Sequence, residues 1–324
     1  MVEFTRRSVV TMLCSTAVIP ARAQSPWPPV TLVVPFPPGG STDALARLLA
    51  SRAQQPLGAN IIVENRAGGM GSIGAAQVAH GRPDGSSFLV TFDSHATIPA
   101  LVNPPPFDVD KDLEPVLLVG TAPYVIAANP ARPFKSFADV VAAARQKPEA
   151  VTYSSAGPGT IGHLAMVLLG KKAGVQMTHV PYKGAGPAIN DTIGGHVDLI
   201  AASIAILLPQ IKAGTLRPLM QTGLHRADAL KDVPTAIESG FPDFDASAWW
   251  GIFAPKGTPP AIVSKASAVF TAALREDAVS HQLRDTQQIN LTLEGPDRFK
   301  KFFDRQVEVW GKVIRENNIK AQSS

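Results

Sequence analysis

The chain lacks the residues that covalent cross-linking and thiolate chemistry require. Of its 324 residues only Cys14 is a cysteine, and it lies in an N-terminal segment that we expect to be removed. The remaining chain can form neither a disulfide nor a thiolate metal site. Histidines outside the candidate loops described below show no metal-ligand spacing with acidic partners. We therefore expect no metal and no cofactor.

Long hydrophobic runs and blocks of one charge are also missing. Beyond the N-terminus, no stretch approaches the roughly 20 apolar residues that a membrane span needs. Charged residues make up 17% of the chain, the formal net charge is +4, and no long basic run is present. These features argue against a nucleic-acid partner. We expect a soluble monomer that is not embedded in a membrane.

The N-terminal segment has the features of an export signal. A basic pair, Arg6-Arg7, precedes a short and mostly apolar core at residues 9–19. Ala21-Arg22-Ala23 then supplies small residues at the two positions that signal peptidase reads. The surroundings of the basic pair loosely resemble a twin-arginine signal, so general secretory and twin-arginine export both stay open. We expect residues 1–23 to be the signal peptide and the mature protein to be periplasmic.

Strands and helices alternate at short intervals, which predicts an α/β fold with doubly wound sheets. The alternation runs from Val30 to Phe92 and restarts at Tyr124. Residues 124–128 and 249–254 have the pattern of strands that cross between two units. We therefore predict two lobes joined by two crossing strands, with a hinge between them. Lobe 1 comprises residues 27–124 and 249–324, and lobe 2 comprises residues 125–248.

The same local pattern joins a strand to a helix in each predicted lobe. It occupies residues 35–43, where Ser41 or Thr42 is expected to cap the helix, and residues 154–160. A helix N-terminus presents unpaired amides and a partial positive charge, and glycine lets a ligand approach the backbone. In open α/β sheets such loops lie at the carboxyl ends of strands, where ligands bind. Either loop alone could be a turn and a cap, but the pair favours an anion-binding cleft.

Further motifs accompany these loops. They are Ala46-Arg47, residues 64–69, Pro83-Asp84-Gly85, Pro181-Tyr182-Lys183-Gly184 with Pro187-Ala188, residues 195–198 and residues 211–214. With these motifs, over about residues 28–319, the chain resembles the Bug family, the substrate-binding receptors of tripartite tricarboxylate transporters. The resemblance implies a periplasmic binding protein of the type II-like Venus flytrap class that performs no chemistry. It also implies a small mono-, di- or tricarboxylate ligand, aromatic acids and amino acids included, and a two-component membrane permease as partner.

The resemblance also implies which residues bind the ligand. In lobe 1 they are Phe36, Pro38, Gly39, Gly40, Ser41, Thr42, Asp43, Ser94 and His95. In lobe 2 they are Ser154, Ser155, Gly157, Gly159, Thr160, His163, Tyr182, Lys183, Gly184 and Ser203. The two histidines could equally be cap or core partners.

The sequence departs from the family pattern at one point. Ile200-Ala201-Ala202-Ser203 stands where an apolar residue, Phe, Asp and Asn are common. These smaller side chains are expected to enlarge the pocket, and they leave the identity of the carboxylate open.

Two other functions stay open. A secreted hydrolase would use Ser154 or Ser155 with His163, but the chain has no Gly-x-Ser-x-Gly elbow and no evident acid to orient the histidine. A binding protein that feeds a sensor kinase would share every feature described so far.

The signal assignment predicts a mature N-terminus at Gln24 or within a residue or two of it, because cleavage follows the small-residue motif. N-terminal sequencing of protein from the periplasmic fraction checks this. Recovery of Met1, or of a lipid-modified Cys14, would contradict it.

Overall fold

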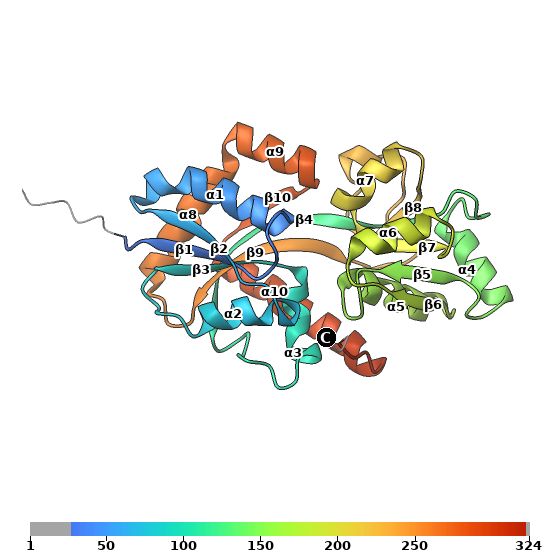
Figure 1. The fold of residues 1–324 in the computed structure, drawn as a ribbon, viewed down its shortest axis with the longest axis horizontal. Coiled ribbons are helices and arrows are strands. Elements are labelled where there is room, and N and C mark those ends of the chain that lie inside the picture. Colours follow the sequence, from blue (N-terminus) through green and yellow to red (C-terminus); the bar gives the residue numbers. More distant parts are fainter. Residues whose placement is uncertain (1–26, 322–324) are drawn as a thin grey trace, which may run out of the picture.

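The protein consists of two α/β lobes joined side by side (Figure 1). The structure is a computed structural model that describes residues 27–321, so the predicted signal peptide lies outside the described residues. The strand order passes from one lobe to the other through a single strand, β4 (Leu113–Ala128). The predicted two-lobed α/β fold class is confirmed.

The sheet of the first lobe has a parallel half and an antiparallel half. Its strands follow the order β2 (Ile61–Asn65), β1 (Val30–Val34), β3 (Ser87–Phe92), β9 (Ser247–Pro255), β4 and β10 (Asn290–Glu294). β1 pairs in parallel with β2 and β3, whereas β9 pairs antiparallel with β3 and β4. The helices of this lobe are α1 (Ser41–Leu57), α2 (Ser72–Ala79), α3 (Ile98–Leu101), α8 (Pro260–Arg275), α9 (Asp277–Gln287) and α10 (Pro296–Glu316), with short 3-10 turns η1 (Gly69–Gly71) and η2 (Asp93–Thr97).

The second lobe is smaller and is built around the other end of β4. Its sheet has the order β8 (Arg217–Gln221), β4, β7 (Leu199–Ser203), β5 (Thr152–Ser155) and β6 (Thr178–Pro181). β5 pairs in parallel with both β6 and β7. The helices are α4 (Phe137–Gln146), α5 (Ile161–Ala173), α6 (Ala185–Ile193) and α7 (Ile204–Lys212), and a 3-10 turn η3 (Asp228–Leu230) follows β8.

β4 is longer than the sequence pattern predicts. A strand was expected only from Tyr124, but β4 begins at Leu113. Its first part contains Pro115 and Gly120, and the register with β9 shifts beside both residues. Proline and glycine inside a strand are typical of bulges, and they obscure the strand pattern in the sequence.

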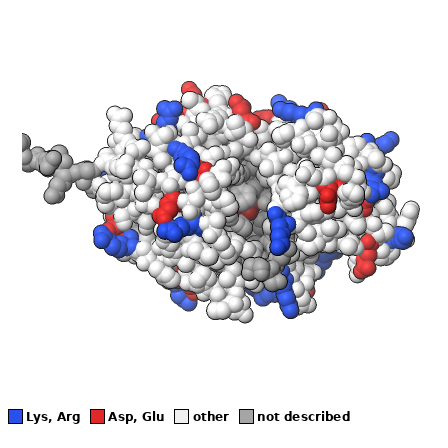
Figure 2. All heavy atoms as spheres, in the orientation of Figure 1, with Lys and Arg blue, Asp and Glu red and all other residues white. Residues whose placement is uncertain are grey.

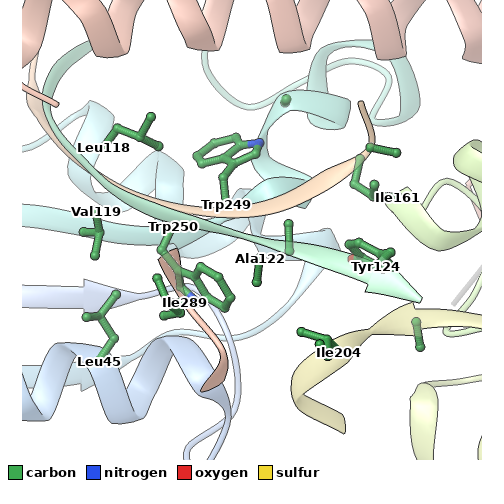
Figure 3. Packing of buried hydrophobic residues seen from close by; sticks show 14 of the residues in the cluster. Leu45, Leu118, Val119, Ala122, Tyr124, Ile161, Ile204, Trp249, Trp250 and Ile289 are labelled. Carbon is green, nitrogen blue, oxygen red and sulfur yellow. The ribbon is translucent and has the colours of Figure 1, made fainter. Parts of the chain in front are cut away.

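Aromatic side chains fill the core on both faces of β9. Trp249 and Trp250 point to opposite sides of the strand (Figure 3), as neighbouring residues in a strand must. Trp249 packs edge-on against Phe299, Phe302 and Phe303 of α10. The two tryptophans are fully buried, so the predicted aromatic pair belongs to the packing of the crossing strands.

Helix α10 touches both lobes. It packs on β4 in the first lobe, and its C-terminal part reaches α5 in the second, where Glu316 pairs with Lys171. Figure 1 shows this helix running below the sheets toward the second lobe. The C-terminal region therefore packs back on the first lobe, as the sequence predicts, and its last helix also contacts the second lobe.

The contact between α10 and β9 predicts a strong effect at Gly251. A Cβ atom there would lie 2.3 Å from Cζ of Phe299, so Gly251→Ala forces a ring of the core to move. We expect a loss of about 1–3 kcal/mol in the free energy of unfolding, measured by urea denaturation. The control is Gly186→Ala in α6, where a Cβ meets no atom within 4 Å. Equal stability of the two variants would contradict this packing.

Candidate functional site

The predicted loops of both lobes lie at the carboxyl ends of parallel strands. β1 leads into residues 35–40 and its neighbour β3 leads into residues 93–97, while β5 leads into residues 156–160. The second loop approaches the first lobe at α3, where a Cβ on Gly159 would lie 2.3 Å from Cδ1 of Leu101. Figure 2 shows a hollow between the two lobes on the face in view. The structure thus places the second predicted loop at the boundary between the lobes and the first predicted loop at the end of β1, beside η2 on the neighbouring strand β3.

Asp43 holds the first loop in shape. Its Oδ2 accepts hydrogen bonds from the Gly39 amide (2.9 Å) and from Nε of Arg47 (3.0 Å). Its Oδ1 accepts one from Nδ2 of Asn65 (2.9 Å). Burial alone would raise the pKa of Asp43, but these hydrogen bonds and the charge of Arg47 lower it below its usual value. We infer that Asp43 braces the loop and that its charge is balanced by Arg47.

The first loop leaves open space at its glycines. Gly39 has a φ of +87°, and a Cβ there meets nothing within 4 Å. Gly40 is the N-cap of α1 without a side-chain cap, so the expected capping by Ser41 or Thr42 is not observed. The first amides of α1 have no acceptor within the helix, as at any helix start. This end of α1 can donate hydrogen bonds to an anion.

In the second loop, residues 156–160, more of the hydrogen-bond donors are already bonded within the protein than in the first loop. The Gly157 amide donates to Oγ of Ser155 (3.2 Å), and the Gly159 amide donates to Nδ1 of His163 (3.1 Å). The Thr160 hydroxyl donates to the Gly157 carbonyl (2.7 Å). The donors left for a ligand are therefore the amides of the first turn of α5, not those of the loop glycines.

A stack of three rings lies under this loop. His163 and His179 are 3.9 Å apart between ring centres and nearly parallel, and Tyr153 covers His179 at 5.0 Å. Nε2 of His179 lies 2.8 Å from Oγ of Ser155. Burial, together with the neighbouring His179, lowers the pKa of His163 to about 3, and burial lowers that of His179 to about 4. Both imidazoles are neutral at pH 7, and their hydrogen bonds fix the loop.

His95 occupies a different environment from the other candidates. Its ring is 1% exposed and lies 5.1–5.8 Å from the rings of Phe107, Phe253 and Phe303. Neither ring nitrogen has a hydrogen-bond partner among the described residues. Burial lowers the pKa of His95 to about 3. The ring thus packs in the core of the first lobe, which favours the alternative role as a core partner.

The remaining candidates of the second lobe divide by exposure. Ser154 is fully buried and its Oγ lies 2.9 Å from Oγ1 of Thr192, which ties β5 to α6. Tyr182 donates to Asp191 (2.6 Å), and the Gly184 amide donates to the Ala156 carbonyl (3.1 Å), which joins residues 181–184 to the second loop. Lys183 is exposed, and Ser203 is half-buried at the start of α7.

Comparison with known proteins identifies the family. The family described as the tripartite tricarboxylate transporter family receptor matches residues 45–319. The chain belongs to this family. It is a periplasmic solute-binding protein, and the Bug resemblance predicted from its motifs is confirmed.

Individual relatives cover almost the whole receptor. Protein BugT of Bordetella pertussis (strain Tohama I) is 34% identical over 318 residues, 97% of each chain. The R. palustris structure described as Rpa4515 with adipate is 32% identical, with a TM-score of 0.78 over 90% of this chain and 98% of that one. MatC (Rpa3494) from Rhodopseudomonas palustris with bound malate is 31% identical, with a TM-score of 0.75 over 89% and 99%.

The sequence missed a buried carboxyl group beside the predicted residues of the receptor. Asp93 is the residue before Ser94, and its Oδ2 accepts a hydrogen bond from the hydroxyl of Tyr124 (3.0 Å). Burial raises the pKa of Asp93 to about 8, although the hydrogen bonds from Tyr124 and from the Ser94 amide act in the opposite direction. Its place at the end of a strand, in Asp93-Ser94-His95, was the one signal available.

A second hollow lies away from all these residues. It has a volume of about 1000 Å³ and lies between α9 and β10 of the first lobe and residues 223–229 of the second. None of the predicted ligand-binding residues lines it. Within residues 27–321 there is no cluster of three potential metal ligands, and no helix there is long and apolar enough to cross a membrane.

The position of His95 predicts that the receptor tolerates an apolar residue there. We expect His95→Leu to keep its stability at pH 7, because no hydrogen bond is lost and the volume changes little. Below about pH 6.5 the unfolded wild type binds a proton at His95 that the folded protein does not bind. This lowers the free energy of unfolding by up to about 1.4 kcal/mol per pH unit, down to about pH 3. The variant should therefore lose less stability than the wild type as the pH falls from 6.5 to 4.

Urea denaturation at pH 7, 6, 5 and 4 measures this difference. Gln282→Leu, at an exposed position without a titratable group, is the control and should leave the acid slope unchanged. A large loss of stability in His95→Leu at pH 7 would show a polar role for the imidazole.

Proposed function

We propose that the protein captures a small carboxylate between its lobes and delivers it to a two-component membrane permease. It acts as a monomer, with lobe 1 formed by residues 27–124 and 249–324 and lobe 2 by residues 125–248. The ligand carboxylate accepts hydrogen bonds from the N-terminus of α1 in one lobe and that of α5 in the other. No covalent chemistry takes place.

The observation that supports this proposal is that a helix N-terminus follows a strand end in each lobe, and that the loop before α5 approaches the first lobe at Leu101. Each helix N-terminus offers first-turn amides and a partial positive charge, which suit an anion. The only carboxylate in the first loop, Asp43, is balanced by Arg47. Relatives of the same family bind adipate and malate, which agrees with a carboxylate ligand.

The departure from the family pattern at residues 200–203 bears on ligand choice. Ile200, Ala201 and Ala202 are buried within the sheet, whereas Ser203 is half-buried at the start of α7. We propose that Ser203 is the member of this segment that meets the distal end of the ligand.

A hydrolase fits the geometry poorly. Ser154 and Ser155 are fully buried, and the histidine beside Ser155 is His179, not His163. The Ser155 hydroxyl also accepts a hydrogen bond from the Gly157 amide. These hydroxyls are structural instead: that of Ser154 ties β5 to α6, and that of Ser155 holds the loop.

Ligand screening by thermal shift tests the proposal. Mono-, di- and tricarboxylates, adipate and malate among them, should raise the melting temperature, and the rise should grow with ligand concentration. Neutral sugars and simple amines should have no effect. Stabilisation by sugars or amines alone would contradict a carboxylate receptor.

Gly40→Val should weaken binding of the best carboxylate by about 10- to 1,000-fold, because its side chain denies the ligand one or two charge-assisted hydrogen bonds. Gly40 has φ −78°, so valine fits the backbone and the fold should persist. Titration calorimetry measures the affinity. The control is Gln55→Val, exposed at the opposite end of α1. Normal affinity in Gly40→Val would remove the first loop from the site.

A further inference from the structure

Asp93 is a carboxyl group buried at the interlobe end of β3. It is 2% exposed and directly follows the strand, next to the predicted ligand residue Ser94. β3 lies beside β1 in parallel, so Asp93 is placed alongside the loop that leads into α1. A buried carboxyl group at the floor of an anion site is unexpected, because its ionised form would repel the ligand.

Tyr124 ties this carboxyl group to the point where β4 begins to pair with the second lobe. The Tyr124 hydroxyl donates to Oδ2 of Asp93 at 3.0 Å, and both side chains are buried. Tyr124 is the first residue of β4 that pairs with the second lobe, opposite Ser203. Its ring also lies against the first turn of α5, 3.4 Å from the Cβ position of Gly162. The hydrogen bond therefore lies at the end of the first lobe where β4 begins to pair with the second lobe, and the Tyr124 ring borders the first turn of α5.

Within residues 27–321, no cation is among the groups that shift the pKa of Asp93, which are its burial, Tyr124 and the Ser94 amide. Of the elements packed most closely on η2, three (η1, α3 and β9) contain no titratable residue. α10 meets η2 through Phe303 on His95, and His95 itself is neutral. His163, next to Gly162 on α5, is neutral as well. Tyr124 is left as the titratable group that faces Asp93, and the pKa of Tyr124 is raised well above its usual value, first by burial.

We propose that Asp93, held by Tyr124, is a specificity-determining residue that admits a carboxylate ligand only while it is itself uncharged. This inference rests on the proposed function and deepens it. An uncharged Asp93 retains one O–H with which to donate to the ligand carboxylate. An ionised Asp93 places a second negative charge in the same desolvated space and excludes the ligand.

Binding is therefore linked to a proton. The burial that raises the pKa of Asp93 to about 8 keeps it uncharged at pH 6 to 7, where affinity is constant. Above about pH 8 the free receptor loses the proton that the complex retains, so the dissociation constant rises by up to tenfold per pH unit.

Titration calorimetry with adipate and malate, both fully ionised above pH 6.5, tests this from pH 6.5 to 9.5 at constant ionic strength. The wild type should bind tightly at pH 6.5 and progressively more weakly above about pH 8. Asp93→Asn, which is uncharged and of the same shape, should bind with little change across the range. Asp232→Asn, an exposed position on the second lobe, is the control and should behave as the wild type.

Tyr124→Phe gives an independent readout. It removes a hydrogen bond that stabilises the ionised Asp93, so the pH at which affinity begins to fall should move upward. If Asp93→Asn does not fold, the shift in Tyr124→Phe alone tests the role of Asp93. An unmoved onset, or a pH dependence that persists in Asp93→Asn, overturns the role of Asp93. If neither these acids nor any other carboxylate binds at pH 6.5, the proposed function itself falls, and this inference with it.

Discussion

The pairing of one strand with two sheets is the constraint on which the rest of the structure depends. β4 lies between β9 and β10 in the first lobe and between β7 and β8 in the second. Every other strand takes its place by pairing outward from it. Between residues 121 and 124, β4 stops pairing with β10 and β9 and begins to pair with β7. We propose that any relative motion of the lobes is a twist of β4 there, because breaking its hydrogen bonds would be costly.

The lobes also meet at places other than the crossing strands. Gly159 approaches Leu101, and Lys171 pairs with Glu316. Both contacts lie away from the crossing strands, and we propose that they separate when a ligand enters. A glycine at position 159 is thus required for close approach of the lobes as well as for its φ of +77°.

The local sequence pattern predicted most helices and strands. The features that it missed depend on contacts between residues far apart in the sequence. The start of α4, for example, is marked in the sequence by Ser136 and Asp139, which form a capping box. The first half of β4 was missed because Pro115 and Gly120 interrupt its pattern, and α9 lacks a clear start signal. In the site, the loops were found from glycine and hydroxyl content. The roles of His95, His179 and Asp93 depend on burial and on partners 24 to 208 positions away, as for His179 with Ser155 and His95 with Phe303, and no local motif encodes them.

Closure of the lobes around an anion is tested most directly by small-angle X-ray scattering of the mature protein with and without a saturating carboxylate. Sharing of the ligand between the α1 and α5 N-termini predicts a smaller radius of gyration in the complex than in the free protein. Superimposable curves for the free and the saturated protein would contradict it, because the ligand would then be held by one lobe alone.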